Sequence, residues 1–358
     1  MAKKYNFYAG PAILPQEVMK KAQAELLDLN GIGLSILEIS HRSKDFEAII
    51  NAAEAKIRSL LGVPENYTVM FLQGGASLQF GMVPMNLLKG GKADYVHTGE
   101  WAKKAIKEAK LFGTVNVAAS AEDKGFNYIP GQFHFSADAR YVHVTSNETI
   151  GGVQWTKFPD TGSVPLVIDM SSDIFSRRID FKNIGMIYAG AQKNIGPAGV
   201  TLVIMRNDLV ESCADGLTTM LSYKTHAKEK SLYNTPPCFA IYIIKLVMDW
   251  IEAQGGLAAV EKVNEQKAKA IYDAIDGSNG YYRGTAEAKD RSKMNVTFRL
   301  PSEELEEKFV NEAKKAGFIG LKGHRSVGGC RASIYNAMDL AGVKALVEFM
   351  GKFATENK

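Results

Sequence analysis

Short apolar runs alternate with segments of helical periodicity through the first two thirds of the chain. The runs are rich in Val, Ile and Tyr, and several are apolar at almost every position, as in strands that helices cover on both faces. We expect helices between most of these strands, with right-handed crossovers. The predicted strands are Tyr67–Phe71, Asp94–His97, Thr114–Ala118, Tyr141–Thr145, Leu166–Asp169, Met186–Gly190 and Val200–Met205. This pattern predicts an α/β fold whose large domain holds a mainly parallel seven-stranded sheet flanked by helices.

The pattern changes after Pro236-Pro237, which opens a helix expected to run to about Gln254. Gly255-Gly256 then separates this helix from an amphipathic segment and marks a candidate domain boundary. The later predicted elements are the helices Leu257–Ile275, Ser302–Ala316 and Asp339–Phe353 and the strands Asn295–Leu300 and Ala332–Tyr335. We therefore expect an N-terminal segment (1–14) that packs with the small domain, a large domain (15–255) and a smaller α+β domain (256–358).

Length, composition and charge indicate how many domains to expect and which classes of partner and location are disfavoured. The 358 residues exceed the range of about 250–300 over which one core keeps growing, so two domains are expected. The net charge of +4 is small and its cations are scattered among acids, which disfavours nucleic acid as a partner. The chain lacks a membrane-length apolar run, the apolar stretch of a signal peptide and any CxxC pair. We expect a soluble, cytoplasmic protein without a metal site.

A glycine loop joins the first predicted strand to a helix, in Phe71-Leu-Gln-Gly-Gly-Ala-Ser-Leu-Gln-Phe80. The backbone N–H groups of Ala76 and Ser77 would face an anion such as phosphate, with the helix dipole behind them. A tight turn without a ligand has the same sequence features. The loop does not form GxGxxG and the acidic residue that the motif expects after the next strand is missing, which disfavours a nucleotide-binding Rossmann module.

Two ionisable residues stand at the ends of predicted strands. Asp169 ends one strand, and strand carboxyl ends in an open α/β sheet face the ligand crevice. Lys193 follows 24 residues later (193 − 169 = 24), among small and apolar neighbours that should lower the pKa of its amine. A lysine is ordinarily a solvated surface charge. Together, however, the two residues suit a pyridoxal phosphate site, where a carboxylate pairs with the pyridinium nitrogen and a lysine holds the aldehyde.

Four blocks of sequence carry a resemblance to a known family. They are Asn6-Phe-Tyr-Ala-Gly-Pro-Ala12, Ser40-His-Arg-Ser43 with the loop from Gln73 to Gln79, Tyr188-Ala-Gly-Ala-Gln-Lys-Asn-Ile-Gly-Pro197, and Gly323-His-Arg-Ser-Val-Gly-Gly-Cys-Arg-Ala-Ser-Ile-Tyr-Asn336. Through them the chain resembles the class-V, fold-type-I aminotransferases that use pyridoxal 5′-phosphate. Within these it is similar to the phosphoserine aminotransferase family over essentially its full length.

The resemblance implies roles for individual residues. Lys193 would hold the cofactor aldehyde and move a proton between Cα of the substrate and C4′ of the cofactor, and Asp169 would pair with the pyridinium nitrogen. Trp101 would stack on the ring, and Thr149 would bond its phenolic oxygen or a neighbouring group. The residues implied at the cofactor phosphate are Gln192, Ala76 and Ser77, together with Asn234 and Thr235 from the other subunit of a homodimer.

The resemblance also implies the reaction, a reversible ping-pong transfer between L-glutamate and 3-phosphohydroxypyruvate. Its products are 2-oxoglutarate and O-phospho-L-serine, in L-serine biosynthesis, and a phosphorylated 4-hydroxythreonine step of pyridoxine synthesis is a second implied use. The anions would bind His41, Arg42, His324, Arg325 and Arg331. Among these, Arg331 suits the α-carboxylate because arginine binds it with two parallel hydrogen bonds. Some relatives have an arginine at the position of Ser77, so part of the phosphate charge must be met elsewhere here.

Other functions stay open at the level of sequence. A cysteine desulfurase would need a sulfur-accepting cysteine, and Cys330 is the one candidate, although we interpret it as a small packing residue. An alanine- or serine-glyoxylate aminotransferase should lack the paired His-Arg clusters, because its substrates carry one anion fewer. A relative without catalysis is disfavoured by the presence of both Lys193 and Asp169.

Overall fold

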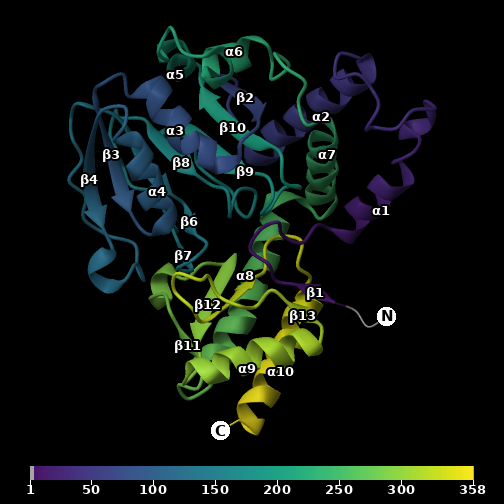
Figure 1. Cartoon of the computed structure of the whole chain (residues 1–358), viewed down its shortest axis with the longest axis vertical. Coiled ribbons are helices and arrows are strands. Elements are labelled where there is room, and N and C mark those ends of the chain that lie inside the picture. Colours follow the sequence, from purple (N-terminus) through teal and green to yellow (C-terminus); the bar gives the residue numbers. More distant parts are fainter. Residues whose placement is uncertain (1–3, 358) are drawn as a thin grey trace.

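Seven strands form one sheet at the centre of the larger part of the molecule (Figure 1). In spatial order they are β2 (Tyr67–Leu72), β10 (Thr201–Arg206), β9 (Ile184–Gly190), β8 (Leu166–Asp169), β5 (Ala139–Thr145), β3 (Lys92–His97) and β4 (Thr114–Ser120). Strand β10 runs antiparallel to both of its neighbours, and the remaining pairs are parallel. The prediction of a mainly parallel seven-stranded sheet is confirmed, and every predicted strand overlaps an observed one.

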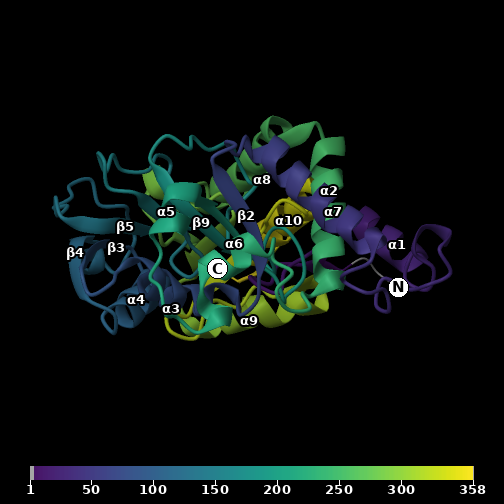
Figure 2. The ribbon, with the colours of Figure 1, turned by 90° about the horizontal axis from the view of Figure 1, so that it is seen from above.

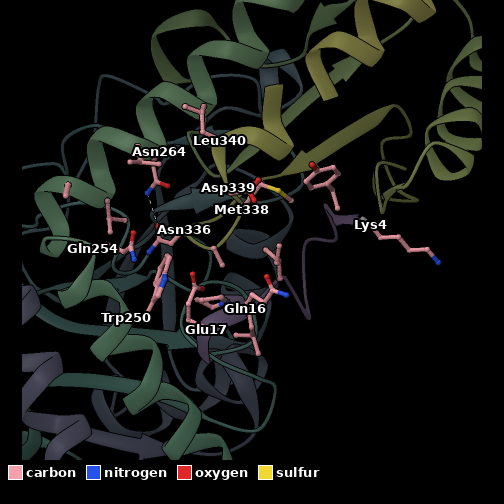
Figure 3. A pocket seen from close by; sticks show the side chains of 18 residues that line it. Lys4, Gln16, Glu17, Trp250, Gln254, Asn264, Asn336, Met338, Asp339 and Leu340 are labelled. Carbon is pink, nitrogen blue, oxygen red and sulfur yellow. Dashed lines mark hydrogen bonds between the residues drawn. The ribbon is translucent and has the colours of Figure 1, made fainter. Parts of the chain in front are cut away.

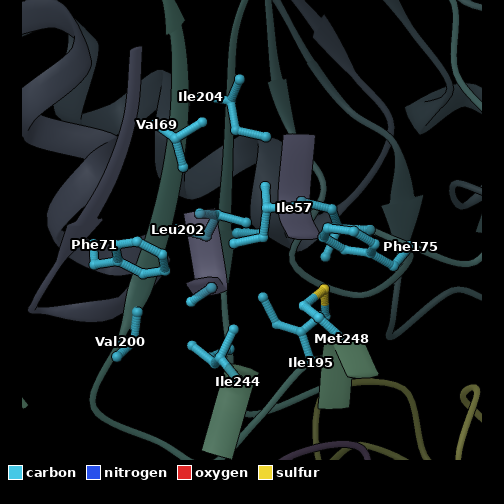
Figure 4. Packing of buried hydrophobic residues seen from close by; sticks show 14 of the residues in the cluster. Ile57, Val69, Phe71, Phe175, Ile195, Val200, Leu202, Ile204, Ile244 and Met248 are labelled. Atoms are coloured by element: carbon cyan, nitrogen blue, oxygen red, sulfur yellow. The ribbon is translucent and has the colours of Figure 1, made fainter. Parts of the chain in front are cut away.

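Both faces of the central strands of this sheet are buried, as the apolar runs in the sequence require, whereas the edge strand β4 is partly exposed. On β10, Leu202 and Ile204 pack on one face with α2 (Lys44–Leu61) and α7 (Cys238–Ala253), as Figure 4 shows. The alternating residues Val203 and Met205 pack on the opposite face, in a cluster that includes side chains of α3 (Gly75–Leu87) and α4 (Glu100–Ala109). This alternation follows from the two-residue period of a strand.

The prediction that helices lie between most of these strands is wrong. Between residues 67 and 206, the connections β2–β3 and β3–β4 contain α3 and α4, and the other four connections contain no α-helix. Those four consist of turns, the 3₁₀ turn Glu122–Lys124, and a short hairpin of β6 (Asn147–Glu148) and β7 (Val153–Gln154). One sheet face is covered instead by α2 and α7, which come before and after the sheet in the chain. Figure 2 shows these two helices side by side.

The smaller part of the molecule carries a three-stranded antiparallel sheet of β11 (Arg283–Gly284), β12 (Asn295–Arg299) and β14 (Cys330–Ser333). Its helices are α8 (Gly256–Asp276), α9 (Glu303–Lys315) and α10 (Leu340–Glu356). The helices α9 and α10 begin at Ser302 and Asp339, whose side chains accept hydrogen bonds from the first turn. The predicted strand Ala332–Tyr335 is displaced, because the chain leaves the sheet after Ser333.

The structure, a computed structural model, describes residues 4–357, so residues 1–3 of the predicted N-terminal segment and Lys358 lie outside it. The first described residues of that segment pack against the smaller part of the molecule, and its later residues contact the larger part, where the backbone N of Ala12 donates to the backbone oxygen of Gln192. Strand β1 (Tyr5–Asn6) pairs in parallel with β13 (Phe318–Ile319), and Phe7 is buried in the same apolar cluster. None of the helices between residues 4 and 357 combines the length and apolar character needed to cross a membrane.

We propose that the domain boundary lies near Gly255-Gly256, at the start of α8. The separate apolar clusters of the two parts support this proposal. Helix α8 contacts both clusters, since Leu257 belongs to the large one and Ile271 to the small one. The remaining helices are α1 (Gln16–Ala24), α5 (Asn207–Ser212) and α6 (Tyr223–Lys228). Figure 2 shows α1 and the loop after it projecting from the body of the molecule.

Candidate active site

Lys193 lies in the turn that follows β9 and is surrounded by three of the predicted residues. Its Nζ donates a hydrogen bond of 2.7 Å to Oγ1 of Thr149 and lies 5.1 Å from the centroid of the Trp101 ring. Burial lowers the pKa of Lys193 to about 8, although the negative charge of Asp169 opposes this shift. The amine is therefore partly neutral near neutral pH, as a nucleophile must be. We call Lys193, Thr149, Trp101 and Asp169 the lysine cluster.

Asp169 ends β8 and is buried at the carboxyl edge of the sheet. Ser171 donates two hydrogen bonds to Asp169, from its backbone N and its Oγ, and both go to Oδ1, at 2.9 and 2.6 Å. Within residues 4–357, Oδ2 receives no hydrogen bond. Burial raises the pKa of Asp169, because a charged carboxylate is poorly solvated there. A cationic nitrogen bound at Oδ2 would stabilise the charge, so Asp169 fits the pyridinium nitrogen of the predicted cofactor.

The glycine loop forms the N-terminus of α3. Gly74 has a left-handed backbone (φ 85°), and a Cβ there would lie 2.5 Å from a side-chain carbon of Leu78, so the turn requires glycine. Ala76 and Ser77 lie in the first turn of α3, where backbone N–H groups have no acceptor within the helix. The Gln192 side chain lies close to Gly190, on the turn that carries Lys193. These groups fit a phosphate at the helix N-terminus.

Glu148 connects the lysine cluster to α4 and was not singled out from the sequence. Its buried carboxylate accepts hydrogen bonds from the backbone N of Trp101 (3.4 Å) and of Ala102 (3.2 Å), at the N-terminus of α4. A Cβ on Gly99 would lie 2.7 Å from this carboxylate, so glycine allows the close approach. Glu148 therefore fixes the turn that carries Trp101, and its neighbour Thr149 accepts from Lys193.

Cations of the smaller part of the molecule face the lysine cluster. Nη1 of Arg331, on β14, donates to the backbone oxygen of Thr149 at 3.2 Å, while its Nε is buried without an acceptor among the described residues. Burial and the positive charges of Arg331, Arg325 and Lys104 lower the pKa of His324. A cavity of about 200 Å³ beside these groups is lined by His324 and Arg331 and, from the large domain, by Gly151. This region suits an anion.

Lys104 is a second residue that sequence reasoning missed. It lies on the first turns of α4, and its Nζ is 4.5 Å from the centroid of the Trp101 ring. A solvated surface lysine and an anion-binding lysine look alike in a sequence. The helical spacing between Trp101 and Lys104 was the one available signal, because side chains three apart lie on one face of a helix.

Four predicted residues lie apart from the lysine cluster. His41 and Arg42 precede α2, and Asn234 and Thr235 precede α7. Over residues 4–357, none of the four forms a hydrogen bond or ion pair with the cluster. Nε2 of His41 is buried without a partner among the described residues, and Asn234 donates to the backbone oxygen of Thr235 at 3.2 Å. Within the described part of the chain, therefore, no hydrogen bond or ion pair links these residues to Lys193.

Comparisons with known proteins identify the family of the chain. The family model for aminotransferase class-V matches residues 4–346. A phosphoserine aminotransferase of Desulfosudis oleivorans is 60% identical over 356 residues, which cover 99% of this chain and 98% of that protein. The structure of a phosphoserine aminotransferase from Bacillus circulans subsp. alkalophilus is 55% identical, covers 99% of each chain and superposes with a TM-score of 0.98. The PLP-bound phosphoserine aminotransferase from Trichomonas vaginalis is 40% identical, with a TM-score of 0.92, covering 98% of this chain and 100% of that one.

Proposed function

The chain belongs to the class-V aminotransferases and within them to the phosphoserine aminotransferase family, and we propose that it transfers an amino group between L-glutamate and 3-phosphohydroxypyruvate. The products are 2-oxoglutarate and O-phospho-L-serine, as in L-serine biosynthesis. The observation that carries the proposal is the convergence of Lys193, Thr149 and Asp169 with Arg331 of the small domain. A nucleophile, a buried carboxylate and a carboxylate-binding arginine thus meet at one place.

Pyridoxal 5′-phosphate supplies, when bound, an aldehyde that carries the amino group and a ring that accepts the electrons released at the substrate Cα. Asp169 would hold the ring nitrogen, Trp101 the ring face, and the N-terminus of α3 with Gln192 the phosphate. The lowered pKa of Lys193 lets its amine take a proton from Cα and return it near neutral pH. Thr149 orients this amine through the hydrogen bond of 2.7 Å.

The two ends of the substrate need separate cations. Arg331 is positioned for the α-carboxylate, because one of its nitrogens is fixed on the Thr149 backbone and its buried Nε is still unpaired. The phosphate, or the side-chain carboxylate of glutamate, would then bind His324 and Arg325 together with Lys104. Lys104 supplies a positive charge near the site, as is needed because Ser77 stands where some relatives have an arginine. His41 and Arg42 complete the proposed set.

We propose further that the enzyme is a cytoplasmic homodimer in which Asn234 and Thr235 reach the cofactor phosphate of the partner subunit. The absence of a hydrogen bond between them and the lysine cluster, among the described residues of one chain, supports this arrangement. The projecting segment between α1 and α2 adds support, because it exposes apolar side chains close to His41 and Arg42 in the sequence. These side chains are Leu27, Ile32, Leu34 and Leu37. Exposed apolar side chains grouped in one segment mark an interface between proteins.

An absorbance spectrum of the purified protein, before and after addition of O-phospho-L-serine, tests the function. We expect a visible band from the cofactor bound at Lys193, and we expect phosphoserine to bleach it. Bleaching by alanine or cysteine but not by phosphoserine would instead indicate a glyoxylate aminotransferase or a desulfurase. A protein that stays colourless with added cofactor would contradict the assignment.

Two variants test the assigned roles. Lys193→Ala should remove transamination completely and leave the fold intact, because the amine has no substitute in the cluster. Asp169→Ala should bind the cofactor weakly and turn over slowly, because the ring nitrogen loses its counter-ion. Steady-state assays with glutamate and 3-phosphohydroxypyruvate, or with phosphoserine and 2-oxoglutarate, measure both effects, and circular dichroism checks the fold. Full turnover in either variant would disprove the corresponding role.

A further inference from the structure

We infer that three buried asparagines, Asn194, Asn264 and Asn336, form an amide clasp across the domain boundary that positions Lys193 relative to Arg331. Asn194 directly follows Lys193, and Asn336 lies on the loop that continues the chain from Arg331 and β14. The catalytic part of this inference rests on the proposed function, whereas the clasp is a set of hydrogen bonds that does not depend on it.

Asn194 joins the two domains through both ends of its side chain. Its Oδ1 accepts a hydrogen bond of 2.8 Å from the backbone N of Asn336, and its Nδ2 donates to the backbone oxygen of Ile174 at 2.6 Å. Ile174 lies in the loop that follows β8 and Asp169. A single side chain therefore connects the lysine turn, the loop after Asp169 and the small-domain loop.

Asn336 repeats the arrangement from the other side. Its Nδ2 donates to the backbone oxygen of Phe175 at 2.9 Å, and its Oδ1 accepts from Nδ2 of Asn264 at 2.8 Å. Figure 3 shows Asn264 on α8 directed at Asn336, on the wall of a cavity of about 480 Å³. No predicted site residue lines that cavity. The asparagines pair backbone groups that lie outside helices and strands, and buried backbone groups require such partners.

Lys267 fixes the small-domain end of the clasp. It is fully buried on α8, and its Nζ donates to four backbone oxygens of the loop 334–338. These oxygens belong to Ile334, Tyr335, Asn336 and Met338. The loop is thus held rigidly to α8, so the hydrogen bonds of the clasp transmit the position of the small domain to the lysine turn.

A second set of hydrogen-bonded amides connects the large domain to β14, the strand that carries Arg331. Asn147 donates to Oδ1 of Asn295 at 2.8 Å, and Asn295 donates to Oγ of Ser333 at 2.9 Å. Asn147 precedes Glu148 and Thr149 in the chain, so this contact also crosses from the large domain to β14. Ser333 and Asn336 both follow Arg331 in the chain, so the segment after Arg331 is attached to the large domain at two points. Loss of the clasp removes one of them and should displace Arg331 without unfolding the domain.

Hydrogen–deuterium exchange of the cofactor-free protein tests the clasp without any assumption about the substrate. In Asn194→Ala the Asn336 amide loses its acceptor, so it should exchange about tenfold faster or more. Asn183→Ala is the matched control, because that asparagine donates only to the exposed Asp160 and should leave the 334–338 segment unchanged. Unchanged protection of Asn336 in a folded Asn194→Ala protein would overturn the inference.

Asn194→Asp provides an independent variant if the alanine variant does not fold. Its carboxylate still accepts from the Asn336 amide but cannot donate to Ile174, so protection of Asn336 should persist. Residues 170–176 should then exchange faster, and unchanged exchange in that segment would also refute the clasp.

Steady-state kinetics test the catalytic consequence separately. For Asn194→Ala we expect kcat to fall and KM for glutamate to rise, each by about tenfold, because Arg331 and Lys193 lose their fixed separation. The visible band of bound cofactor should remain, since the clasp does not bind it. Accelerated exchange with unchanged kcat and KM would show that the clasp has a structural role only. Loss of all activity in the parent protein would challenge the proposed function and not the clasp.

Discussion

The chemistry of Lys193 is decided by opposing effects on a single amine. Burial lowers its pKa, the nearby carboxylates of Asp169 and Glu148 raise it, and the guanidinium of Arg331 lowers it again. The result is a pKa of about 8, well below the ordinary value of 10.5. Removing either carboxylate would therefore make the amine more acidic, and removing Arg331 would make it less so.

The rate at which the cofactor-free protein captures pyridoxal 5′-phosphate should follow this pKa. Only the neutral amine attacks an aldehyde, so the rate should rise by about tenfold per pH unit below pH 8 and level off above it. Stopped-flow absorbance from pH 6 to 9 measures this dependence. Free Nα-acetyl-lysine, whose side-chain amine can still react with the cofactor, is the control for the ionisation of the cofactor itself. A rate still rising steeply at pH 9 would show that the amine is not perturbed.

The same residues show what a sequence reveals about a site. Lys193 and Asp169 could be identified because Asp169 ends an apolar strand and Lys193 lies in the turn just after another, and parallel strands bring their carboxyl ends to one edge. Glu148 could not, because its importance depends on facing the N-terminus of a helix distant in the chain. Asn194 and Asn336 were hidden for the same reason, since an amide that pairs loops from two domains has no local sequence pattern. The catalytic roles themselves stay predictions.

At the level of elements, the strands were predictable and the helices that cover them were not. The predicted strand Leu166–Asp169 coincides with β8, because three apolar residues are followed directly by an aspartate and then by a loop. The antiparallel direction of β10 has no signal in its sequence, since β10 is as buried as β8 and β9, which run parallel to each other. Likewise, the periodicity of α2 and α7 predicts helices but not which sheet face they cover.

The N-terminus of α4 illustrates how an element depends on a distant residue. No side chain of its own caps this helix, and the carboxylate of Glu148 receives the backbone N–H groups instead. Burial raises the pKa of Glu148 from 4.5 to about 7, because the charged form is poorly solvated. The folded pKa exceeds the unfolded one, so the stabilisation linked to this proton is present below pH 4.5 and lost as pH rises through 7.

Glu148→Gln should therefore change the pH dependence of stability. Glutamine cannot ionise, so the thermal midpoint of the variant, relative to the parent, should increase as pH rises from 4.5 to 7. Thermal unfolding of the cofactor-free proteins at several pH values measures the difference. Glu148→Ala separates the effect of the charge from that of the helix cap. Because alanine cannot accept from the backbone N–H groups, this variant should lose about 1 kcal/mol of unfolding free energy at every pH, in addition to the effect of removing the charge. A pH-independent difference for glutamine would mean that Glu148 is already charged at low pH.

For the whole molecule, the distribution of site residues argues for assembly. The lysine cluster and Arg331 are joined by hydrogen bonds within one chain, whereas no hydrogen bond among the described residues joins Asn234 or Thr235 to them. In a symmetric dimer the same patch on each chain would complete both sites at once. Each proposed site then combines Lys193 of one subunit with Asn234 and Thr235 of the other.

Mixed dimers of two defective variants test this arrangement. One variant carries Lys193→Ala, and the other carries Asn234→Ala together with Thr235→Ala. Both are assayed at a cofactor concentration low enough that the Asn234→Ala, Thr235→Ala variant alone is inactive. After joint unfolding and refolding, about half of the dimers are mixed, and each mixed dimer has one site with every residue intact. Activity should thus recover to roughly a quarter of that of the unmodified protein. If all residues acted within one chain, every site would carry a defect and no activity would return. Recovery therefore distinguishes a shared site from two independent ones, even if the contacts at the interface differ from those proposed.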